Sequence, residues 1–96
     1  MKPSEALARY KATIRQVVED NHARNPRVFG SVARGEDMAA SDLDLLVDAL
    51  PGATLFDFGA IQVELERTLG VRVEVLTLED IHPKFRSHVL SEAVPV

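Results

Sequence analysis

Hydrophobic residues recur in this chain at two spacings, one typical of helices and the other of strands. From about Ser4 to Ala23 an apolar residue returns every three or four positions, which predicts an amphipathic helix. Ser4 is a candidate N-cap, and Asn25-Pro26 is expected to end the helix, because the residue before a proline disfavours the α region. The predicted buried stripe consists of Leu7, Tyr10, Ile14, Val17 and Val18.

Three short apolar runs predict strands. The first, Arg27-Val28-Phe29, ends in a tight turn at Gly30-Ser31. The second covers residues 42–48 and is broken by Pro51-Gly52. The third covers residues 71–77, where three valines alternate with other residues, as expected for a strand with two unlike faces.

A second helix is predicted to begin near Thr54, which has capping-box spacing with Asp57. Gly70 stands where a glycine commonly follows the last helical turn. Phe56 and Phe58 are expected in the core or at its edge. The residues that line one face of this helix are Phe58, Ile61, Leu65 and Leu69.

The remaining segments complete the predicted order α-β-β-α-β-α. Residues 32–38 are polar and glycine-punctuated, which predicts one helical turn and a loop, and residues 83–91 predict a last short helix with Phe85 and Val89 facing inward. The order predicts an α+β fold, a small mixed β-sheet of about three strands covered by helices. We expect residues 1–96 to form a single domain.

Charge and composition narrow the classes of function. The net charge of −4 and the pI of about 5.3 argue against nucleic acid as a partner, because such binding requires a basic face. The chain has no cysteine, which excludes disulfides and thiolate metal sites. No apolar run is long enough to span a membrane, and the first residues do not resemble a signal peptide. We therefore expect a cytoplasmic protein that does not bind membranes.

Two acidic residues in the second predicted strand suggest metal chemistry. Asp42 and Asp44 are two positions apart, so on a strand their carboxylates point to the same face. Carboxylates so placed repel each other unless a cation lies between them, and Mg²⁺ is a hard cation that prefers oxygen ligands. The alternative is that Asp42 caps a turn and Asp44 is a solvated strand residue.

The turn after the first predicted strand is a candidate phosphate site. Gly30 allows backbone N–H groups to approach a phosphate closely, and the hydroxyl of Ser31 adds a donor. The guanidinium of Arg34 matches phosphate geometry. Each residue also has a simpler interpretation, as a strand-to-helix turn for Gly30 and Ser31 and a solvated surface side chain for Arg34. The turn and the acid pair lie at the ends of adjacent predicted strands, where α/β folds place ligands.

Together these residues resemble the signature of the DNA polymerase beta-like nucleotidyltransferases. The pattern is Gly30-Ser31, ten intervening residues, then Asp42-x-Asp44, and its fuller form resembles the minimal nucleotidyltransferase (MNT) branch. The segments ELERTLG, VEVLT and HVLSEAVPV are similar to that branch too, so the resemblance covers nearly the whole chain.

The resemblance implies a role for each of these residues. Asp42 and Asp44 would hold two Mg²⁺ ions, and a third acid on a neighbouring strand would complete the site and help to deprotonate the acceptor hydroxyl. The matching position is Glu74, where the family usually has aspartate. Glu74 could instead form an ion pair with Arg72. The turn at Gly30 and Ser31, together with Arg34, would bind the triphosphate of ATP.

The resemblance also implies a partner. MNT proteins of the antitoxin type transfer AMP from ATP to a tyrosine of a HEPN-type ribonuclease toxin. A chain of 96 residues leaves little room for an acceptor-binding domain, which agrees with a protein as acceptor. Two alternatives stay open, a non-catalytic antitoxin that neutralises its partner by binding, and nucleotidyl transfer to a small molecule.

Overall fold

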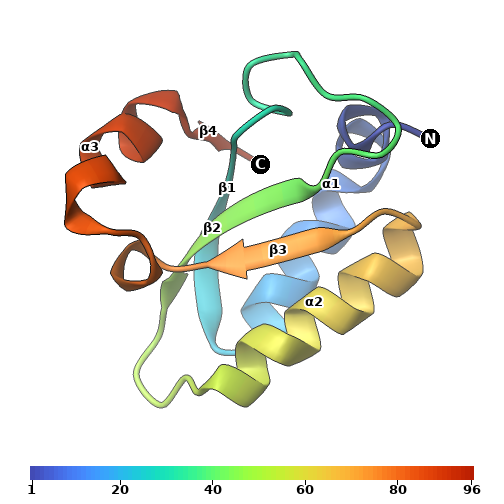
Figure 1. The fold of residues 1–96 in the computed structure, drawn as a ribbon. Helices are drawn as coiled ribbons and strands as arrows, with labels where there is room; N and C mark the ends of the chain where they lie inside the picture. Colours follow the sequence, from blue (N-terminus) through green and yellow to red (C-terminus); the bar gives the residue numbers. More distant parts are fainter.

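The computed structural model describes residues 1–96 and places two helices against one face of a β-sheet, with a third helix apart from them (Figure 1). The predicted order of elements is confirmed up to the last helix, after which a further strand follows. The elements are α1 (Pro3–Asp20), β1 (Ala23–Phe29), β2 (Leu43–Ala49), α2 (Leu55–Leu69), β3 (Val73–Leu76), the 3₁₀ helix η1 (Leu78–Asp80), α3 (Pro83–Glu92) and β4 (Val94–Pro95).

The sheet is mixed and has the strand order β3-β2-β1-β4. β1 pairs antiparallel with both β2 and β4, whereas β2 and β3 are parallel, joined by the crossover helix α2. The predicted α+β class with a small mixed sheet is confirmed, but the sheet has four strands rather than about three. β4 was missed because a strand of two residues at the sheet edge is too short to show a periodic pattern.

The hydrophobic core lies between the sheet and the pair α1 and α2. β2 supplies it with Leu43, Leu45 and Val47, because alternate residues of a strand point to the same face. The predicted face of α2 is confirmed, with Ile61, Leu65 and Leu69 buried and Phe58 packed at the core edge. In α1 the buried residues are Pro3, Ala6, Ile14, Val17 and Val18, while Leu7 and Tyr10 are partly buried.

The sequence-based limits of α2 were accurate. Asp57 accepts a hydrogen bond from the backbone N–H of Thr54 at 2.9 Å, which satisfies a donor at the start of the helix. Gly70 follows the last residue with φ of 71°, the left-handed conformation that glycine adopts at low cost. The capping residues and the terminal glycine lie next to the helix ends in the sequence, so the limits of α2 do not depend on contacts with other elements.

The limits of α1 differ from the prediction at both ends. The helix begins at Pro3, so Ser4 is not its N-cap; the N–H of Ser4 instead donates to the buried carboxylate of Asp37 at 2.9 Å. This contact lowers the pKa of Asp37 and ties the loop before β2 to the start of α1. The helix ends at Asp20, five residues before Asn25-Pro26, and His22 then reverses the chain with φ of 56°.

Asn25 and Pro26 lie inside β1 rather than in a helix terminus. The strand is irregular there: Asn25 has φ of 54°, and its register with β2 shifts between Arg24 and Arg27. Such a bulge is one of the few places where a paired strand tolerates a proline, which has no N–H to donate.

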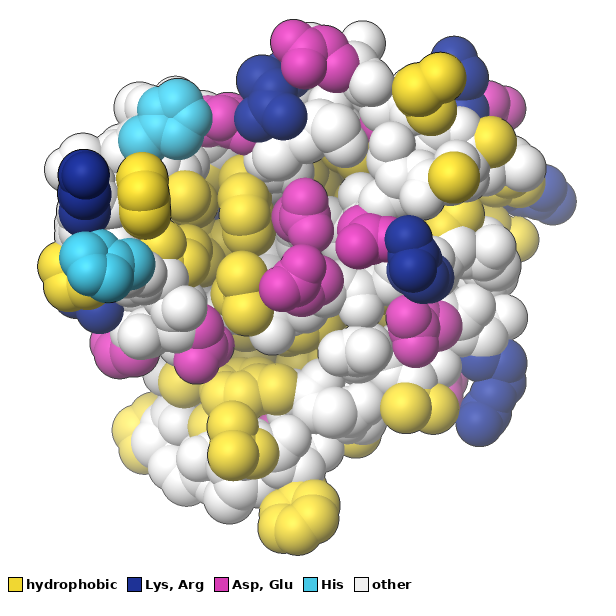
Figure 2. Space-filling model, viewed as in Figure 1, with side chains coloured by type: hydrophobic (Ala, Val, Ile, Leu, Met, Phe, Trp, Pro, Cys, Tyr) yellow, Lys and Arg dark blue, Asp and Glu magenta, His cyan; other side chains and the backbone are white.

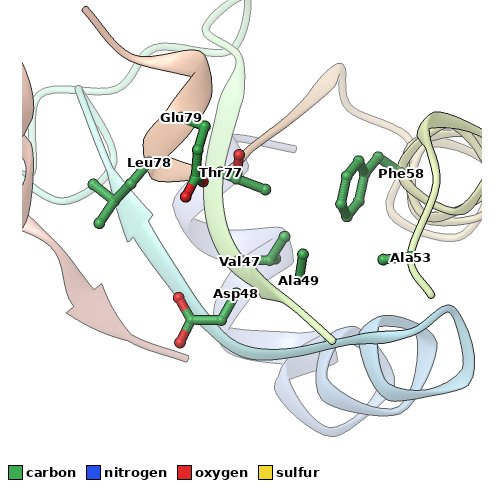
Figure 3. Close-up of a pocket in the computed structure, with 8 residues that line it drawn as sticks. All are labelled: Val47, Asp48, Ala49, Ala53, Phe58, Thr77, Leu78 and Glu79. Atoms are coloured by element: carbon green, nitrogen blue, oxygen red, sulfur yellow. The ribbon is translucent and has the colours of Figure 1, made fainter. Parts of the chain in front are cut away.

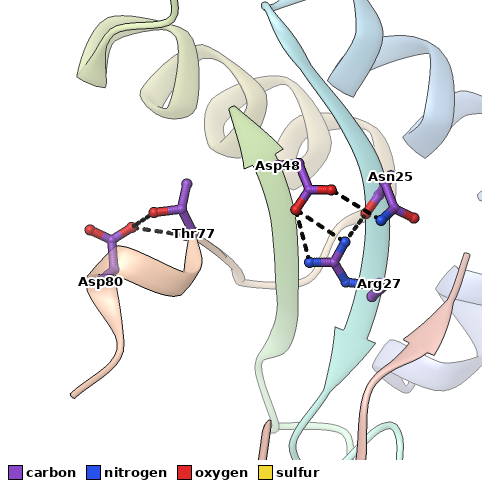
Figure 4. Close-up of polar contacts among 5 residues, drawn as sticks. All are labelled: Asn25, Arg27, Asp48, Thr77 and Asp80. Carbon is purple, nitrogen blue, oxygen red and sulfur yellow. Dashed lines mark hydrogen bonds and ion pairs between the residues drawn. The ribbon is translucent and has the colours of Figure 1, made fainter. Parts of the chain in front are cut away.

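Polar contacts to Asp48 of β2 hold the bulge in place (Figure 4). Its carboxylate accepts from the Asn25 amide at 3.1 Å and from the Arg27 guanidinium at 3.1 Å. Arg27 also donates to the backbone carbonyl of Asn25 at 2.9 Å. The hydrogen bond from Arg27 is the main cause that lowers the pKa of Asp48. Figure 4 also shows the carboxylate of Asp80, which accepts hydrogen bonds from the backbone N–H and the hydroxyl of Thr77 at the start of η1.

Residues 31–35 form hydrogen-bonded turns that lead into a loop, and the N–H of Arg34 donates to the carbonyl of Gly30 at 3.2 Å, the spacing of a helical turn. Two further predictions, for Phe85 and Phe56, were wrong for reasons of packing. In α3 no residue is buried and Phe85 is 54% exposed, because this helix stands apart from α1 and α2 (Figure 1). Phe56 is 90% exposed, since α2 turns the face of Phe58 rather than that of Phe56 toward the core.

The longest helix, α1, buries only one stripe of its surface. None of the helices combines the length and the apolar character needed to cross a bilayer.

We expect Leu45→Ala to lower the free energy of unfolding by about 2–5 kcal/mol, because it leaves a cavity in the fully buried centre of β2. Phe56→Ala is the matched control, since it removes a larger side chain from an exposed position, and its effect should stay within about 0.5 kcal/mol. Urea unfolding followed by circular dichroism measures both. Equal losses would mean that the core does not lie where the structure places it.

Candidate functional site

The register of the sheet places two of the predicted site acids side by side. Asp44 of β2 is paired with Glu74 of β3, and on its other side with Phe29, the last residue of β1. Both carboxylates are on the face of the sheet opposite to α1 and α2, because Leu43 and Leu45 point toward those helices. Figure 2 views this face and shows acidic side chains gathered at its centre with a basic side chain beside them.

The turn after β1 lies directly against the same acids. Gly30 has φ of 75°, and a Cβ added to it would lie 2.4 Å from Oδ2 of Asp44, which is closer than real Cβ contacts. Glycine is therefore required at this position for two reasons: the backbone has a positive φ, and the carboxylate of Asp44 fills the space that a side chain would need. The predicted phosphate turn and the predicted metal acid are thus in contact, although fourteen positions separate them in the sequence.

The first acid of the motif is turned toward a basic residue. Asp42 precedes β2, and its Oδ1 lies 2.9 Å from Nε of Arg72. Arg72 was expected as a possible partner of Glu74, but the ion pair forms with Asp42. The contact is not aligned as a hydrogen bond, so Oδ1 of Asp42 is a buried oxygen without a hydrogen-bond donor. A carboxylate oxygen that is paired by charge but has no aligned hydrogen bond can exchange its arginine partner for a metal cation.

Burial and like charges act together on Asp44. Its pKa is raised from 3.8 to about 6, first because the half-buried carboxyl loses solvation, then because Glu74 and Asp42 add negative charge nearby. The charge of Arg34 opposes this rise but does not cancel it. The site therefore disfavours its own full ionisation and would be relieved by a cation.

Arg34 is close to the turn but is paired with two acids. Its Nε lies 3.2 Å from Glu36, and its Nη1 donates to Oε1 of Glu92 at 2.9 Å. The same Oε1 accepts the backbone N–H of Gly30 at 2.5 Å. Ser31 is half-buried within the same turn. Sequence reasoning assigned no role to Glu92, although it lies in the HVLSEAVPV segment, because only the folded chain brings α3 to the turn.

The structure thus brings Gly30, Arg34, Asp44 and Glu74 together and places Asp42 at the margin of this cluster. The donor set suits Mg²⁺, since it consists of carboxylates and Oδ1 of Asp42 has no aligned hydrogen bond. The three acids are not yet arranged around one point: no group of three or more acidic, histidine or cysteine side chains forms a ready metal site. Binding a cation would require Asp42 to reorient from Arg72.

A pocket of about 350 Å³ opens elsewhere, at the far end of β2 (Figure 3). It contains none of the predicted site residues, and Asp48 at its edge lies about 13 Å along the strand from Asp44, given the rise of a strand per residue. It is lined by Val47, Asp48, Ala49, Ala53, Phe58, Thr77, Leu78 and Glu79. The acids lie on an open surface instead.

Comparison with protein families and curated proteins gives a consistent result. The nucleotidyltransferase domain family matches residues 11–96. The chain is similar to MJ0435 of Methanocaldococcus jannaschii, which is assigned as a protein adenylyltransferase. The two are 38% identical over 86 residues, which is 90% of this chain and 92% of that protein.

Two solved structures share the fold. One, assigned as a minimal nucleotidyltransferase, superposes with a TM-score of 0.86 at 42% identity and covers 100% of this chain and 97% of its own. The other is a crystal structure of a toxin–antitoxin with AMP-PNP, with a TM-score of 0.75 at 20% identity, covering 88% of this chain and 70% of its own. At that identity the second comparison shows a shared fold only.

Gly30→Ala should destabilise the protein more than Gly35→Ala. Both glycines have positive φ, 75° and 70°, which costs about 1–2 kcal/mol for an alanine. Only at Gly30 does the new methyl group also collide with Asp44, since nothing lies within 4 Å at Gly35. Urea unfolding of each variant, alone and combined with Asp44→Ala, checks the cause. The additional loss at Gly30 should disappear once the Asp44 carboxylate is removed; if it persists, the contact is not its origin.

Asp44→Asn should raise the melting temperature in metal-free buffer at pH 8. The folded pKa of about 6 lies above the unfolded value, so Asp44 favours folding below pH 4 and loses that contribution as the pH rises through 6. The neutral amide avoids this loss, and the gain should shrink toward pH 4.

Asp48→Asn is the control for that substitution on the same strand. The pKa of Asp48 is lowered by Arg27, so its stabilising contribution is present above the unfolded pKa and is lost as the pH falls. This variant should therefore melt at a lower temperature than the parent protein at pH 8. Shifts of the same sign for both variants in calorimetry would refute the electrostatic assignment.

Proposed function

We propose, on the premise that this chain belongs to the nucleotidyltransferase domain family, that it transfers AMP from ATP to a hydroxyl group of a partner protein. The specific acceptor that we propose is a tyrosine of a HEPN-type ribonuclease toxin, which makes this chain an antitoxin. The assignment of MJ0435 as a protein adenylyltransferase supports the class of acceptor.

The observation that carries this proposal is the contact between the turn and the acids. A nucleotidyltransferase must hold a triphosphate beside carboxylates that bind cations. Here Gly30 accommodates the carboxylate of Asp44 directly, and Glu74 is paired with Asp44 on the next strand.

In the proposed reaction the acceptor oxygen bonds to the α-phosphorus, the bond from that phosphorus to the pyrophosphate oxygen breaks, and pyrophosphate leaves. Asp42, Asp44 and Glu74 would bind Mg²⁺, which we propose as two ions. The bound Mg²⁺ would neutralise charge on the transferred phosphate and on the leaving pyrophosphate. Gly30, Ser31 and Arg34 donate hydrogen bonds to the triphosphate. Glu74 is exposed at the site and accepts the proton of the acceptor hydroxyl.

The openness of the site favours a protein as acceptor. The acids lie on an exposed face of the sheet and not in the pocket, so a side chain of another folded protein can reach them (Figure 2). The crystal structure of a toxin–antitoxin with AMP-PNP has the same fold as this chain, so the proposed toxin partner is compatible with this fold. Because the reaction consumes ATP, we place it in the cytoplasm.

Asp42→Ala and Asp44→Ala should each reduce transfer by more than about a hundredfold, because each removes a ligand for the cation that stabilises the transition state. A candidate HEPN-type partner protein is incubated with this chain, ATP and Mg²⁺, and the intact mass of the partner is measured. A gain of one or more AMP units is expected with the parent protein.

Asp20→Asn, an exposed acid at the end of α1, is the control and should retain transfer. A partner that gains no mass with any nucleoside triphosphate, yet is still neutralised in a stable complex, would show that this chain acts by binding alone. Labelling that survives both alanine substitutions would show that the acids are not the site.

A further inference from the structure

Glu92, at the end of α3, lies in the turn where the triphosphate is proposed to bind. Its Oε1 accepts both the backbone N–H of Gly30 at 2.5 Å and Nη1 of Arg34 at 2.9 Å. Its Oε2 lies 3.2 Å from Nε2 of His88. The side chain is only 12% exposed, although α3 has no buried residue. The carboxylate is therefore held within the turn and does not extend into solvent.

The backbone that follows Glu92 is anchored to the sheet. Immediately after it, β4 pairs with Arg27 and Val28 of β1, and the N–H of Val96 donates to the carbonyl of Pro26 at 3.0 Å. Figure 1 shows the end of α3 and β4 beside the end of β1 that leads into the turn. The position of Glu92 thus follows from the fold of the C-terminal segment, while its flexible side chain can still change rotamer.

We propose that Glu92 is an internal competitor of the nucleotide: its carboxylate takes the place of a phosphate oxygen at Gly30 and Arg34, and ATP must displace it to bind. This inference rests on the proposed function, because it assigns the donors of that site. A carboxylate and a phosphate both present anionic oxygens to a backbone N–H and a guanidinium. The N–H of Gly30 is a single donor whose direction is set by the backbone, so it cannot serve both acceptors fully.

Charge strengthens the competition. A triphosphate placed beside an ionised Glu92 meets like charge as well as donors that are already engaged. Displacement by rotation of the side chain frees Gly30 and Arg34 and leaves α3 and β4 in place. Glu36 differs in this respect, because it also pairs with Arg34, at 3.2 Å, but makes no contact with Gly30.

Glu92→Gln should therefore bind ATP with Mg²⁺ about tenfold more tightly than the parent protein, since hydrogen bonds to charged groups contribute that much or more. Isothermal titration calorimetry without an acceptor protein measures the affinity. Glu36→Gln is the matched control: it removes a charge from the same arginine, but from a side chain that does not accept the N–H of Gly30, and its affinity should change less than about threefold.

The three outcomes of this titration are distinguishable. Tighter binding by Glu92→Gln alone supports the inference. Binding by all proteins with Glu92→Gln equal to or weaker than the parent overturns the inference and leaves the proposed function standing, because Glu92 would then support the turn and not compete for it. No binding by any of the proteins overturns both.

A measurement on the unmodified protein guards against a variant that folds poorly. In protein labelled with ¹³C and ¹⁵N, ATP with Mg²⁺ should shift the side-chain carboxyl resonance of Glu92 and the amide resonance of Gly30 together. The carboxyl resonance of Glu79, which lies at the separate pocket, should not move. Binding that leaves the Glu92 carboxyl resonance unchanged would show that the carboxylate stays in place, which overturns the inference.

Discussion

The backbone register between β1, β2 and β3 is the constraint on which the rest of the site depends. It aligns Phe29, Asp44 and Glu74 in one row across the sheet, so that the turn after Phe29 meets the acid of β2 and the acid of β3 lies beside it. A shift of one residue in β3 would turn Glu74 to the face covered by helices. The buried residues Leu45 and Val47 set the register of β2, because moving them to the other face would expose the core.

The site is assembled against its own electrostatic repulsion. Burial and the neighbouring acids raise the pKa of Asp44, so the fold holds a carboxylate where its charged form is disfavoured. The hydrophobic core beneath the sheet compensates for this cost. Sites that bind cations and polyanions commonly show such a conflict, because the geometry suits the complex and not the free protein.

Ion pairs within the chain already occupy two charged groups of the site, Asp42 and Arg34. Arg72 lies against Asp42, and Arg34 is shared between Glu36 and Glu92. Binding of a cation or a triphosphate at this surface is therefore an exchange of partners rather than the filling of an empty space. The net affinity is then the difference between two sets of charge-assisted hydrogen bonds, which makes it sensitive to single acidic residues.

Much of the architecture could be predicted from the sequence because its signals are local. The apolar face of α2, its capping residues and the glycine that follows it are all recognisable from residues within or next to the helix. The motif from Gly30 to Asp44 identifies the candidate site by its residue types and spacing. The predictions that failed, at the end of α1, in β4 and at Phe85, concern residues whose environment is set by distant segments.

By itself the sequence determined which chemical groups are present and which local elements carry them, because periodicity, capping and turn residues act over a few positions. Only the tertiary structure decided that Glu74 faces Asp44, that Arg72 pairs with Asp42 and that Glu92 reaches Gly30. These contacts join residues that are far apart in the chain. Their geometry depends on strand pairing and helix packing across the whole molecule, which no local pattern encodes.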